Sequence, residues 1–369
     1  MRDSIRHRGR PFARIGASLM AFALAGLTVT AIPTRADTAP PEVAQREFTV
    51  MTYNLYLGAN LQPLFGKSGQ PLIDEAQKVL AHVAQTDFSA RAEAIADQIV
   101  EQQPVVVGLQ EVALWQTAPI GAPGQRQTAF DFLAILLDAL QERGMPYRAA
   151  SVNVDFSAAL PISFTTLGVF TDRNVIIVRD DLPSAELKVS DPTDHLFRAV
   201  LPVPIGGGTI NVTRGWATVD VKFRGKSYLV ADTHLEAFDG FIRTLQAQEL
   251  AASLDASALP VVLLGDLNSE PGNLADSYGV MLRAGFVDGW IEAMDGTPGF
   301  TAGQTDDLNN VPSLIDHTVD YVMHNEDGFV DAVAGSGDIV GEELDDRTPS
   351  GLWPSDHAGI ALTMHIADP

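Results

Sequence analysis

Apolar runs of strand length recur along this chain, and polar side chains stand at or near their ends. Four clear runs cover residues 48–53, 105–109, 228–233 and 261–265. Their length and their β-branched side chains predict buried strands. The polar residues at these ends are Asn54, Gln110, Glu111, His234, Asp266 and Asn268, and a further pair, Asp356 and His357, opens the last apolar run. Because strand ends can meet at one edge of a sheet, the sequence predicts one shared polar site.

These residue types suit metal-assisted hydrolysis of a phosphate ester. That reaction needs charge neutralised on the phosphoryl oxygens, a water held in line and a proton delivered to the leaving oxygen. Glu111 and an aspartate can hold a hard divalent cation through oxygen, and the amides of Asn54 and Asn268 can ligate metal or donate N–H groups to phosphate. The two histidines, His234 and His357, could then serve as acid and base.

The first 36 residues have the organisation of an export signal. Arginines at positions 2, 6, 8, 10 and 14 precede an apolar stretch over residues 15–32, and Thr34, Arg35 and Ala36 form a small-x-small cleavage site. We expect cleavage after Ala36 and a secreted or periplasmic mature protein. The alternative is a single membrane anchor, which Gly16 and Gly26 disfavour.

Composition narrows the remaining possibilities. The 369 residues include no cysteine, which excludes thiol catalysis, thiolate metal sites and disulfides. After the signal and a short Pro-rich leader at 37–46, residues 47–369 are long enough for one large α/β domain or two smaller ones. The net charge is −23, and the expected signal is basic, so the mature chain is more acidic still. Nucleic acid is therefore disfavoured as a partner, although a local basic patch would allow it.

The rest of the chain predicts an α/β fold with two packed sheets covered by helices. Helical patterns cover residues 90–103, 130–143 and 241–254, and further strands are expected at 174–178, 215–221, 319–323 and 357–366. A tight hairpin is expected at residues 224–226. The long polar or irregular stretches, expected to be loops around a site, are 57–89, 115–128, 151–172, 180–214 and 324–354.

Six short motifs follow one another in order along the chain. They are MTYN at 51–54, LQEV at 109–112, THLEA at 233–237, GDLN at 265–268, VDYV at 319–322 and SDH at 355–357. Their order and spacing resemble the signature of the endonuclease/exonuclease/phosphatase superfamily. This superfamily includes pancreatic-type deoxyribonucleases, abasic-site endonucleases, inositol-polyphosphate phosphatases and secreted neutral sphingomyelinases. The resemblance covers nearly all of the expected mature chain.

The resemblance implies a four-layer α/β sandwich, in which helices flank two packed central mixed β-sheets, with the active site at one end of the sheets. It implies Mg²⁺ as the usual cofactor, with Mn²⁺ as an alternative. By motif, Glu111 would be the principal metal ligand, with Asn54 beside it and Gln110 in support. Asp356 would complete the set of metal ligands or support those ligands from outside. Whether the site holds one metal ion or two stays open.

The same motifs imply the catalytic roles. Asp266 and Asn268 would position or activate the water and bind phosphate. His357, held by Asp320, would be the general base or contact phosphate, while His234 would stabilise phosphate or assist the leaving group. The acid and base assignments of the two histidines stay open at this stage. A carboxylate on one ring nitrogen fixes the tautomer of a histidine and raises its basicity, which agrees with the pairing of Asp320 and His357.

Departures from the family pattern bear on the substrate. Abasic-site endonucleases carry Asn-x-Asp after the first strand, whereas this chain has Asn54, Leu55 and Tyr56, which counts against DNA repair. The THLEA motif looks closer to the secreted sphingomyelinases, but no apolar aromatic hairpin is evident between residues 320 and 356. A transient membrane contact therefore stays open.

These observations lead to one preferred function and two alternatives. We expect an exported, monomeric, Mg²⁺-dependent phosphodiesterase that hydrolyses a lipid-type or small phosphodiester by in-line attack of a metal-positioned water. The first alternative is a secreted non-specific nuclease, and the second is a phosphomonoesterase.

Overall fold

The computed structural model describes residues 47–325 and 330–366, all within the compact unit Pro40–Pro369. The expected signal at 1–36 and the leader at 37–46 lie outside the described residues. Within the described ranges, no helix combines the length and the apolar character needed to cross a membrane.

The first sheet is mixed and has nine strands. In spatial order, seven of them are β15 (Val330–Ala332), β17 (Gly359–Ile366), β1 (Glu47–Asn54), β2 (Val106–Gln110), β6 (Thr166–Arg179), β3 (Leu114–Pro119) and β4 (Gln127–Asp131), while β16 (Asp338–Val340) pairs with β17 and β5 (Tyr147–Pro161) pairs with β6. β1 and β2 run parallel, in a register that places Asn54 opposite Gln110. Two of the predicted polar positions therefore end side by side.

The second sheet has six strands and is also mixed. Its order is β13 (Phe286–Asp288), β14 (Asp320–Asn325), β12 (Val261–Asp266), β11 (Lys226–His234), β10 (Gly215–Phe223) and β7 (Leu187–Leu196). β11 and β12 are parallel with His234 opposite Asp266, and antiparallel β14 begins with Asp320 opposite Asp266. A separate hairpin joins β8 (Leu201–Ile205) to β9 (Gly208–Val212).

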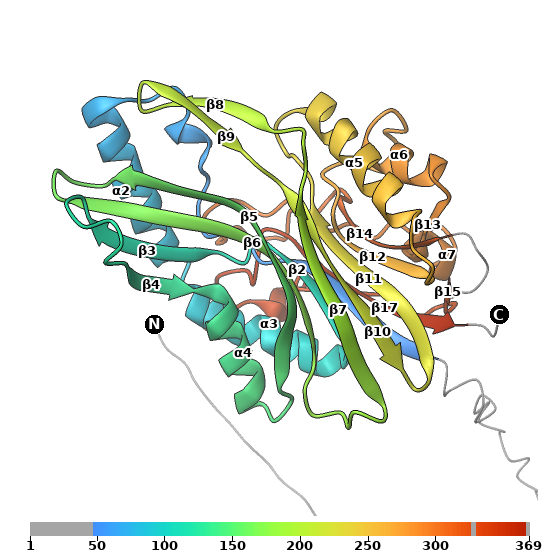
Figure 1. The fold of residues 1–369 in the computed structure, drawn as a ribbon. Helices are drawn as coiled ribbons and strands as arrows, with labels where there is room; N and C mark the ends of the chain where they lie inside the picture. Colours follow the sequence, from blue (N-terminus) through green and yellow to red (C-terminus); the bar gives the residue numbers. More distant parts are fainter. Residues whose placement is uncertain (1–46, 326–329, 367–369) are drawn as a thin grey trace, which may run out of the picture. The chain divides into compact units, whose positions relative to one another are not determined.

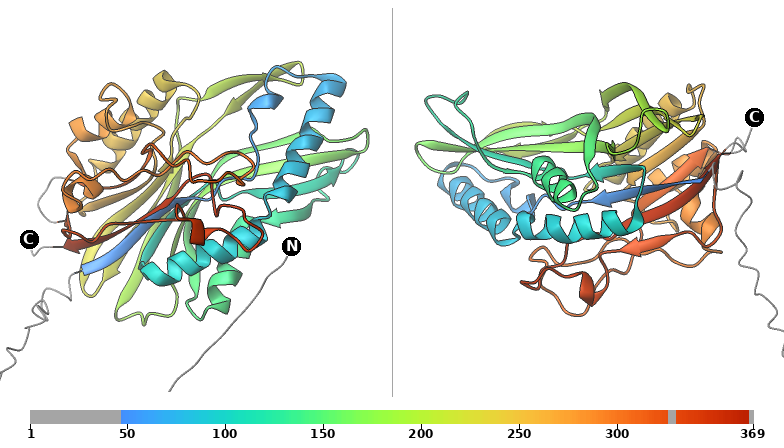
Figure 2. Two further views of the ribbon diagram at one scale, coloured as in Figure 1. Left: turned by 180° about the vertical axis from the view of Figure 1, so that it is seen from behind. Right: turned by 90° about the horizontal axis from the view of Figure 1, so that it is seen from below.

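Helices cover the outer face of each sheet (Figure 1). Beside the first sheet lie α2 (Gly69–Gln85), α3 (Phe88–Gln102) and α4 (Phe132–Glu142), and beside the second lie α5 (Gly240–Leu254) and α6 (Ser277–Arg283). Shorter elements are α7 (Gly289–Ala293), η1 (Gln62–Leu64) and η2 (Leu344–Asp346). One apolar core lies between the sheets, and another lies under the helices on each side. The predicted four-layer α/β sandwich is confirmed (Figure 2).

The two sheets approach closely just behind the polar strand ends. A Cβ added at Gly108 of β2 would lie 2.6 Å from Oδ1 of Asp232 in β11. Two residues further along β2, the Gln110 side chain donates Nε2–H to the same Asp232 oxygen at 2.6 Å. Both side chains are fully buried, so this hydrogen bond joins the sheets inside an otherwise apolar core.

The loop expectations were partly wrong. The stretch 57–89 contains α2, whose buried positions Leu72, Ile73, Ala76, Val79 and Val83 have helical spacing that its Gly- and Pro-containing start obscured. The stretches 115–128, 151–172, 180–214 and 324–354 contain strand residues of β3 to β9 and of β14 to β16.

The hairpin expected at 224–226 is confirmed. It joins β10 to β11, and Arg224 and Gly225 both adopt positive φ, at 47° and 89°. These are the values that a tight two-residue turn requires.

Candidate active site

The eight residues predicted to form the site come together at one end of the sandwich. Asn54, His234 and Asp266 close their strands, Asp320 opens β14, Glu111 and Asn268 follow strand ends, and Asp356 with His357 precedes β17. Asn54 Nδ2 donates to Asp266 Oδ2 at 3.1 Å, which links the first sheet to the second. His234 Nε2 lies 3.5 Å from that same Asp266 oxygen.

Glu111 and Asn268 owe their positions to unusual backbone. Both residues have φ in the left-handed region, at 54° and 51°. A side chain disfavours this conformation, and such strain persists where surrounding contacts fix it, often at functional sites. Leu57 N–H donates to Glu111 Oε2 at 2.7 Å, and Asn268 N–H donates to Asp266 Oδ1 at 2.8 Å. These bonds hold both turns.

Glu111 and Asp356 line one cavity and repel each other electrostatically. Burial and then the Asp356 charge raise the pKa of Glu111 to about 8. Burial also raises the pKa of Asp356, although His357 and Arg91 oppose that rise. Two partly buried carboxylates facing one space favour a bound cation, and oxygen donors are the ligands that hard divalent ions prefer. The residues present therefore fit a divalent metal.

The proposed ligand Asn54 has a more mixed environment. Its Oδ1 accepts the Tyr56 N–H at 3.0 Å, and its Nδ2 is engaged by Asp266. A carbonyl oxygen has two lone pairs, so one remains for a cation. The role of Asn54 as a metal ligand stays a prediction.

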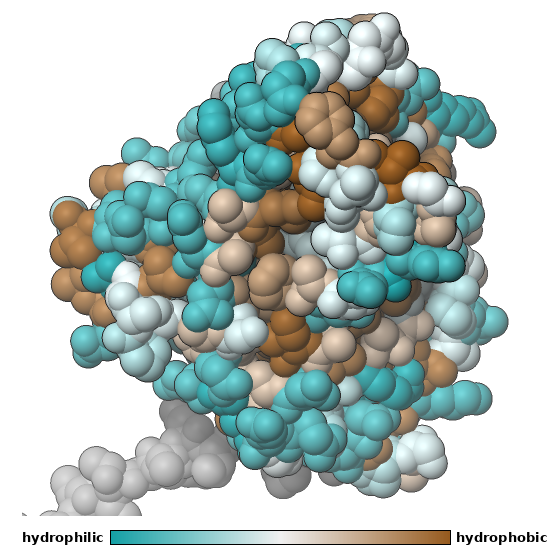
Figure 3. Space-filling model, turned by 90° about the vertical axis from the view of Figure 1, so that its left-hand side faces the viewer, coloured by the Kyte–Doolittle hydropathy of each residue, from teal (hydrophilic) through white to brown (hydrophobic). Residues whose placement is uncertain are grey.

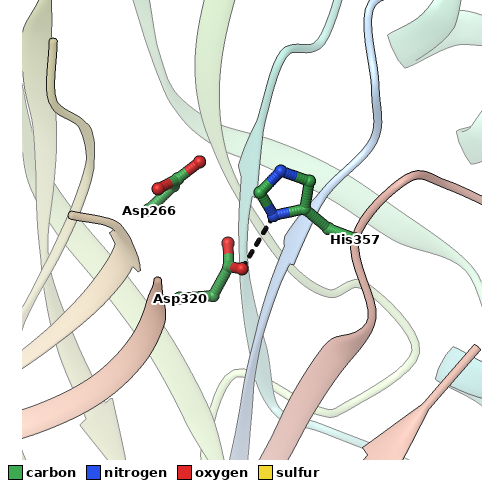
Figure 4. A group of neighbouring side chains, drawn as sticks. All are labelled: Asp266, Asp320 and His357. Carbon is green, nitrogen blue, oxygen red and sulfur yellow. Dashed lines mark hydrogen bonds and ion pairs between the residues drawn. The ribbon is translucent and has the colours of Figure 1, made fainter. Parts of the chain in front are cut away.

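Asp266, Asp320 and His357 form a second cluster, with one ligand atom from each lying within 4.8 Å of the others. In Figure 4 the three side chains point toward a common space. His357 Nδ1 lies 2.8 Å from Asp320 Oδ2. Burial lowers the pKa of His357, but the Asp320 carboxylate outweighs burial and holds that pKa well above its usual range. The Asp320 carboxylate therefore favours the protonated, positively charged form of His357. The cluster could alternatively hold an ion.

His234 has the opposite electrostatic state because of Arg214. Arg214 Nη1 lies 3.1 Å from His234 Nδ1 and 3.0 Å from Asp172 Oδ2. A guanidinium only donates, so His234 Nδ1 must accept and the ring proton must sit on Nε2. Burial, then Arg214 and His357, lower the pKa of His234 well below its usual range. His234 is thus a neutral donor whose N–H faces Asp266.

Asp172 acts on His234 only through Arg214. Asp172 forms an ion pair with this buried arginine. Arg214 stands at the end of a polar stretch directly before β10, a weak signal that did not distinguish it from a surface residue.

Arg91 is a supporting residue that the sequence reasoning missed. It is fully buried, and its guanidinium donates to four backbone carbonyls, those of Leu55, Tyr56, Thr86 and Pro354, at 2.7 to 3.1 Å. It thereby joins the chain after Asn54 to the chain before Asp356. The detectable signal was its place on the apolar face of α3, three residues after Phe88.

The acidic space is one end of a cavity of about 290 Å³. Glu111, Asp172, Arg214, Glu236 and Asp356 line its polar end, and apolar side chains make up most of the remainder. A site with buried acids, a charged histidine, a neutral histidine donor and space beside them is equipped for phosphoester hydrolysis.

Comparison with known proteins agrees with this chemistry. The model of the Endonuclease/Exonuclease/phosphatase family matches residues 51–357. No curated protein sequence matches the chain significantly. Solved structures with the same fold include an endonuclease/exonuclease/phosphatase from Bacteroides vulgatus, with 15% identity, a TM-score of 0.54, and 87% of this chain and 99% of that one covered.

Two further structures are similar to the same extent. A mannosyl-6-phosphatase from Bacteroides thetaiotaomicron has 16% identity and a TM-score of 0.51, with 86% of this chain and 99% of that one covered. D. rerio TDP2 complexed with single-strand DNA product has 15% identity and a TM-score of 0.50, with the same shares covered. With the family model matching more than half of its length, the chain belongs to the endonuclease/exonuclease/phosphatase family of phosphoester hydrolases.

Proposed function

We propose that this protein is an exported, divalent-metal-dependent phosphodiesterase that acts on a lipid-type or other small phosphodiester. The observation that carries the proposal is the convergence of two partly buried carboxylates, Glu111 and Asp356, with the Asp320–His357 pair at one end of the sandwich. We expect Mg²⁺ as the metal, with Mn²⁺ as an alternative. A divalent ion bound there would neutralise charge on the phosphoryl oxygens.

The protein's own residues cover the remaining requirements of the reaction. Hydrolysis forms a bond between a water oxygen and phosphorus while the bond to the leaving oxygen breaks, with inversion at phosphorus. Burial and then Asp320 raise the pKa of Asp266 to about 7, a suitable value for accepting a proton from water near neutral pH. His357, positively charged at rest, can stabilise the phosphoryl oxygens and deliver a proton to the leaving oxygen. His234 donates its Nε2–H.

Charge favours a diester over the two alternatives. Among the described residues that line the cavity, Arg214 is the one cationic side chain, and Asp172 already pairs with it. A monoester carries more negative charge than a diester and needs more cationic groups. A nuclease needs a basic surface for the phosphate backbone, whereas this chain carries a net charge of −23.

Export, assembly and membrane contact are separate parts of the proposal. Export rests on the signal-like residues 1–36, and N-terminal sequencing of secreted protein should find Asp37 first. We propose a monomer that makes at most transient contact with membranes. Nucleic acid is the disfavoured partner.

A parallel assay tests the function directly. The mature protein with Mg²⁺ is given bis-nitrophenyl phosphate, nitrophenyl phosphate, sphingomyelin vesicles and plasmid DNA, each with an EDTA control. Diester or vesicle hydrolysis that EDTA abolishes supports the proposal, and a preference for DNA or for the monoester overturns it.

A matched pair of variants assigns the activity to the site. Glu111→Gln should lower the rate by about two orders of magnitude or more. Glu101→Gln, the same change at an exposed position of α3, should leave it unaltered. Equal activity in both variants would remove Glu111 from the mechanism.

A further inference from the structure

We propose that the apolar part of the cavity binds one aliphatic chain of the substrate, so that the enzyme selects phosphodiesters of single-chain amphiphiles. This inference rests on the proposed function and adds to it a substrate class and a binding site for the group that does not react. The side chains of α2, β5 and β8 that form the apolar walls of this cavity lie outside all six sequence motifs.

Three elements that are distant in sequence build the apolar walls. Val79 comes from α2, Ala158 and Leu160 come from β5, and Val203 comes from β8. Val79 and Val203 are almost completely buried, although all four line open space. The β5–β6 hairpin and the β8–β9 hairpin therefore do more than rim the site, since each closes one side of an apolar chamber.

One aromatic pair of the chamber reaches the surface of the protein. Phe65 and Phe238 line the chamber and meet edge to face, with ring centroids 5.6 Å apart. Phe238 remains 55% exposed. Figure 3 shows apolar residues around a hollow on this side of the molecule, with hydrophilic residues beyond them. Aromatic side chains at an opening into a chamber would let an aliphatic chain pass without crossing charged groups.

Continuity with the polar site identifies the occupant. Glu111, Asp356 and Arg214 line the same cavity as the apolar walls, so a molecule in it presents one end to the reacting groups. An apolar chamber favours hydrocarbon over a charged base or sugar, because burying an unpaired polar group is costly. The occupant that fits both ends is a phosphate ester with an alkyl chain.

Size limits that chain to one. The cavity of about 290 Å³ lies at the lower end of the roughly 300–1,000 Å³ found for small-molecule pockets. It accommodates part of a single chain, and a second chain of a two-chain lipid would have to remain outside.

A chain-length series tests the proposal. Alkyl nitrophenyl phosphodiesters with methyl, butyl, hexyl, octyl and dodecyl groups are assayed with Mg²⁺ below the concentration at which they form micelles. The value of kcat/KM should rise by up to about fourfold for each methylene that enters the chamber and then level off. A rate independent of chain length, with the methyl diester hydrolysed, would overturn the chamber's role while the proposed function stands.

Two variants at adjacent positions of β5 provide the control. Ala158 lines the chamber, while Ala159 is exposed on the other face of the strand. Ala158→Leu should fill space and reduce the preference for octyl over methyl by roughly tenfold or more, with little change for the methyl diester. Ala159→Leu should behave as the unaltered protein does. Equal effects of the two changes would contradict the proposal.

A binding measurement separates this inference from the proposed function. Isothermal titration with octyl phosphate and with methyl phosphate requires no catalysis. Tighter binding of octyl phosphate, weakened by Ala158→Leu but not by Ala159→Leu, supports the chamber even if no diester is hydrolysed. Equal binding of the two phosphates overturns it.

Discussion

Arg91 provides the most demanding test of how the fold holds the site. Its guanidinium donates to four backbone carbonyls and lies over the rings of Phe88, Phe132 and Tyr56. No carboxylate among the described residues forms an ion pair with the Arg91 guanidinium within 4.0 Å. Neutral backbone carbonyls are therefore its main hydrogen-bond partners. Arg91→Met keeps most of the apolar volume and removes all four hydrogen bonds.

The expected loss of stability follows from these contacts. Each of the four hydrogen bonds from the charged guanidinium contributes about 1.5 kcal/mol at the low end of the measured range, about 6 kcal/mol together. Removing the buried guanidinium offsets about 3 kcal/mol of this, because burial of charge is itself unfavourable, as the lowered pKa of Arg91, about 10, indicates. The free energy of unfolding should therefore fall by about 3 kcal/mol.

Arg143 supplies the matched control for this prediction. It also makes four hydrogen bonds, to two side chains and two backbone carbonyls, but its carboxylate partners Glu93 and Asp97 are largely exposed. Exposed ion pairs contribute about 1 kcal/mol or less, so Arg143→Met should cost far less than Arg91→Met.

Urea unfolding of both variants measures the difference in the free energy of unfolding, provided that its dependence on urea concentration is the same in both. Arg91→Met should also need at least about tenfold more Mg²⁺ for half-maximal activity, because Arg91 fixes the backbone beside Asn54 and Asp356. A loss below about 1 kcal/mol, or one equal to that of Arg143→Met, would refute the reasoning.

Three further predictions concern packing, the neutral histidine and pH. Gly108→Ala places a methyl 2.6 Å from a carboxylate oxygen of the second sheet, and urea unfolding should show a loss of about 1–3 kcal/mol. Arg214→Gln removes the donor that fixes the His234 tautomer and depresses its pKa, so kcat should fall about 10- to 100-fold. Because the His234 pKa rises in this variant, the loss should deepen as the pH falls, and a pH-independent loss would exclude the mechanism. Burial raises the pKa of Asp276, but hydrogen bonds from Arg243 lower it below its usual value overall. The ionised Asp276 carboxylate therefore stabilises the fold at neutral pH, and this stabilisation disappears as the pH falls through the depressed pKa. The free energies of unfolding of Asp276→Asn and of the unaltered protein should become equal in acid.

The strands that carry the site could be predicted because they are locally encoded. β-branched apolar runs such as 105–109 and 261–265 are too short for helices and match the buried strands β2 and β12. The elements that enclose the apolar chamber could not be predicted in the same way. α2 begins with Gly and Pro residues that obscure the helical spacing of its apolar side chains, and β5 carries exposed polar positions that interrupt its apolar pattern.

The site residues could be predicted as a set, because the motifs name them in order, but their electrostatic states could not. The sequence left open which of the two histidines acts as acid and which as base. Asp320 makes His357 the charged one, while Arg214 makes His234 the neutral one. The motifs implied the pairing of Asp320 with His357, but the pairing of Arg214 with His234, 20 residues away, belongs to no motif and appeared only in the structure.

The register of the sheets explains why the polar site lies at their ends. Within β11, Asp232 is two residues before His234 and faces the other sheet, where burial raises its pKa well above the usual range. It is tolerated there because Gln110 donates to it. His234 is the next side chain on the same face of β11, at the point where the strand leaves the core. It contacts Asp266 and Arg214 beside a cavity that can hold charge. The hydrogen bond between Asp232 and Gln110 thus fixes the relative register of the two sheets. Since Asn54 pairs with Gln110 and His234 pairs with Asp266, that register sets which polar ends can face one another across the sandwich.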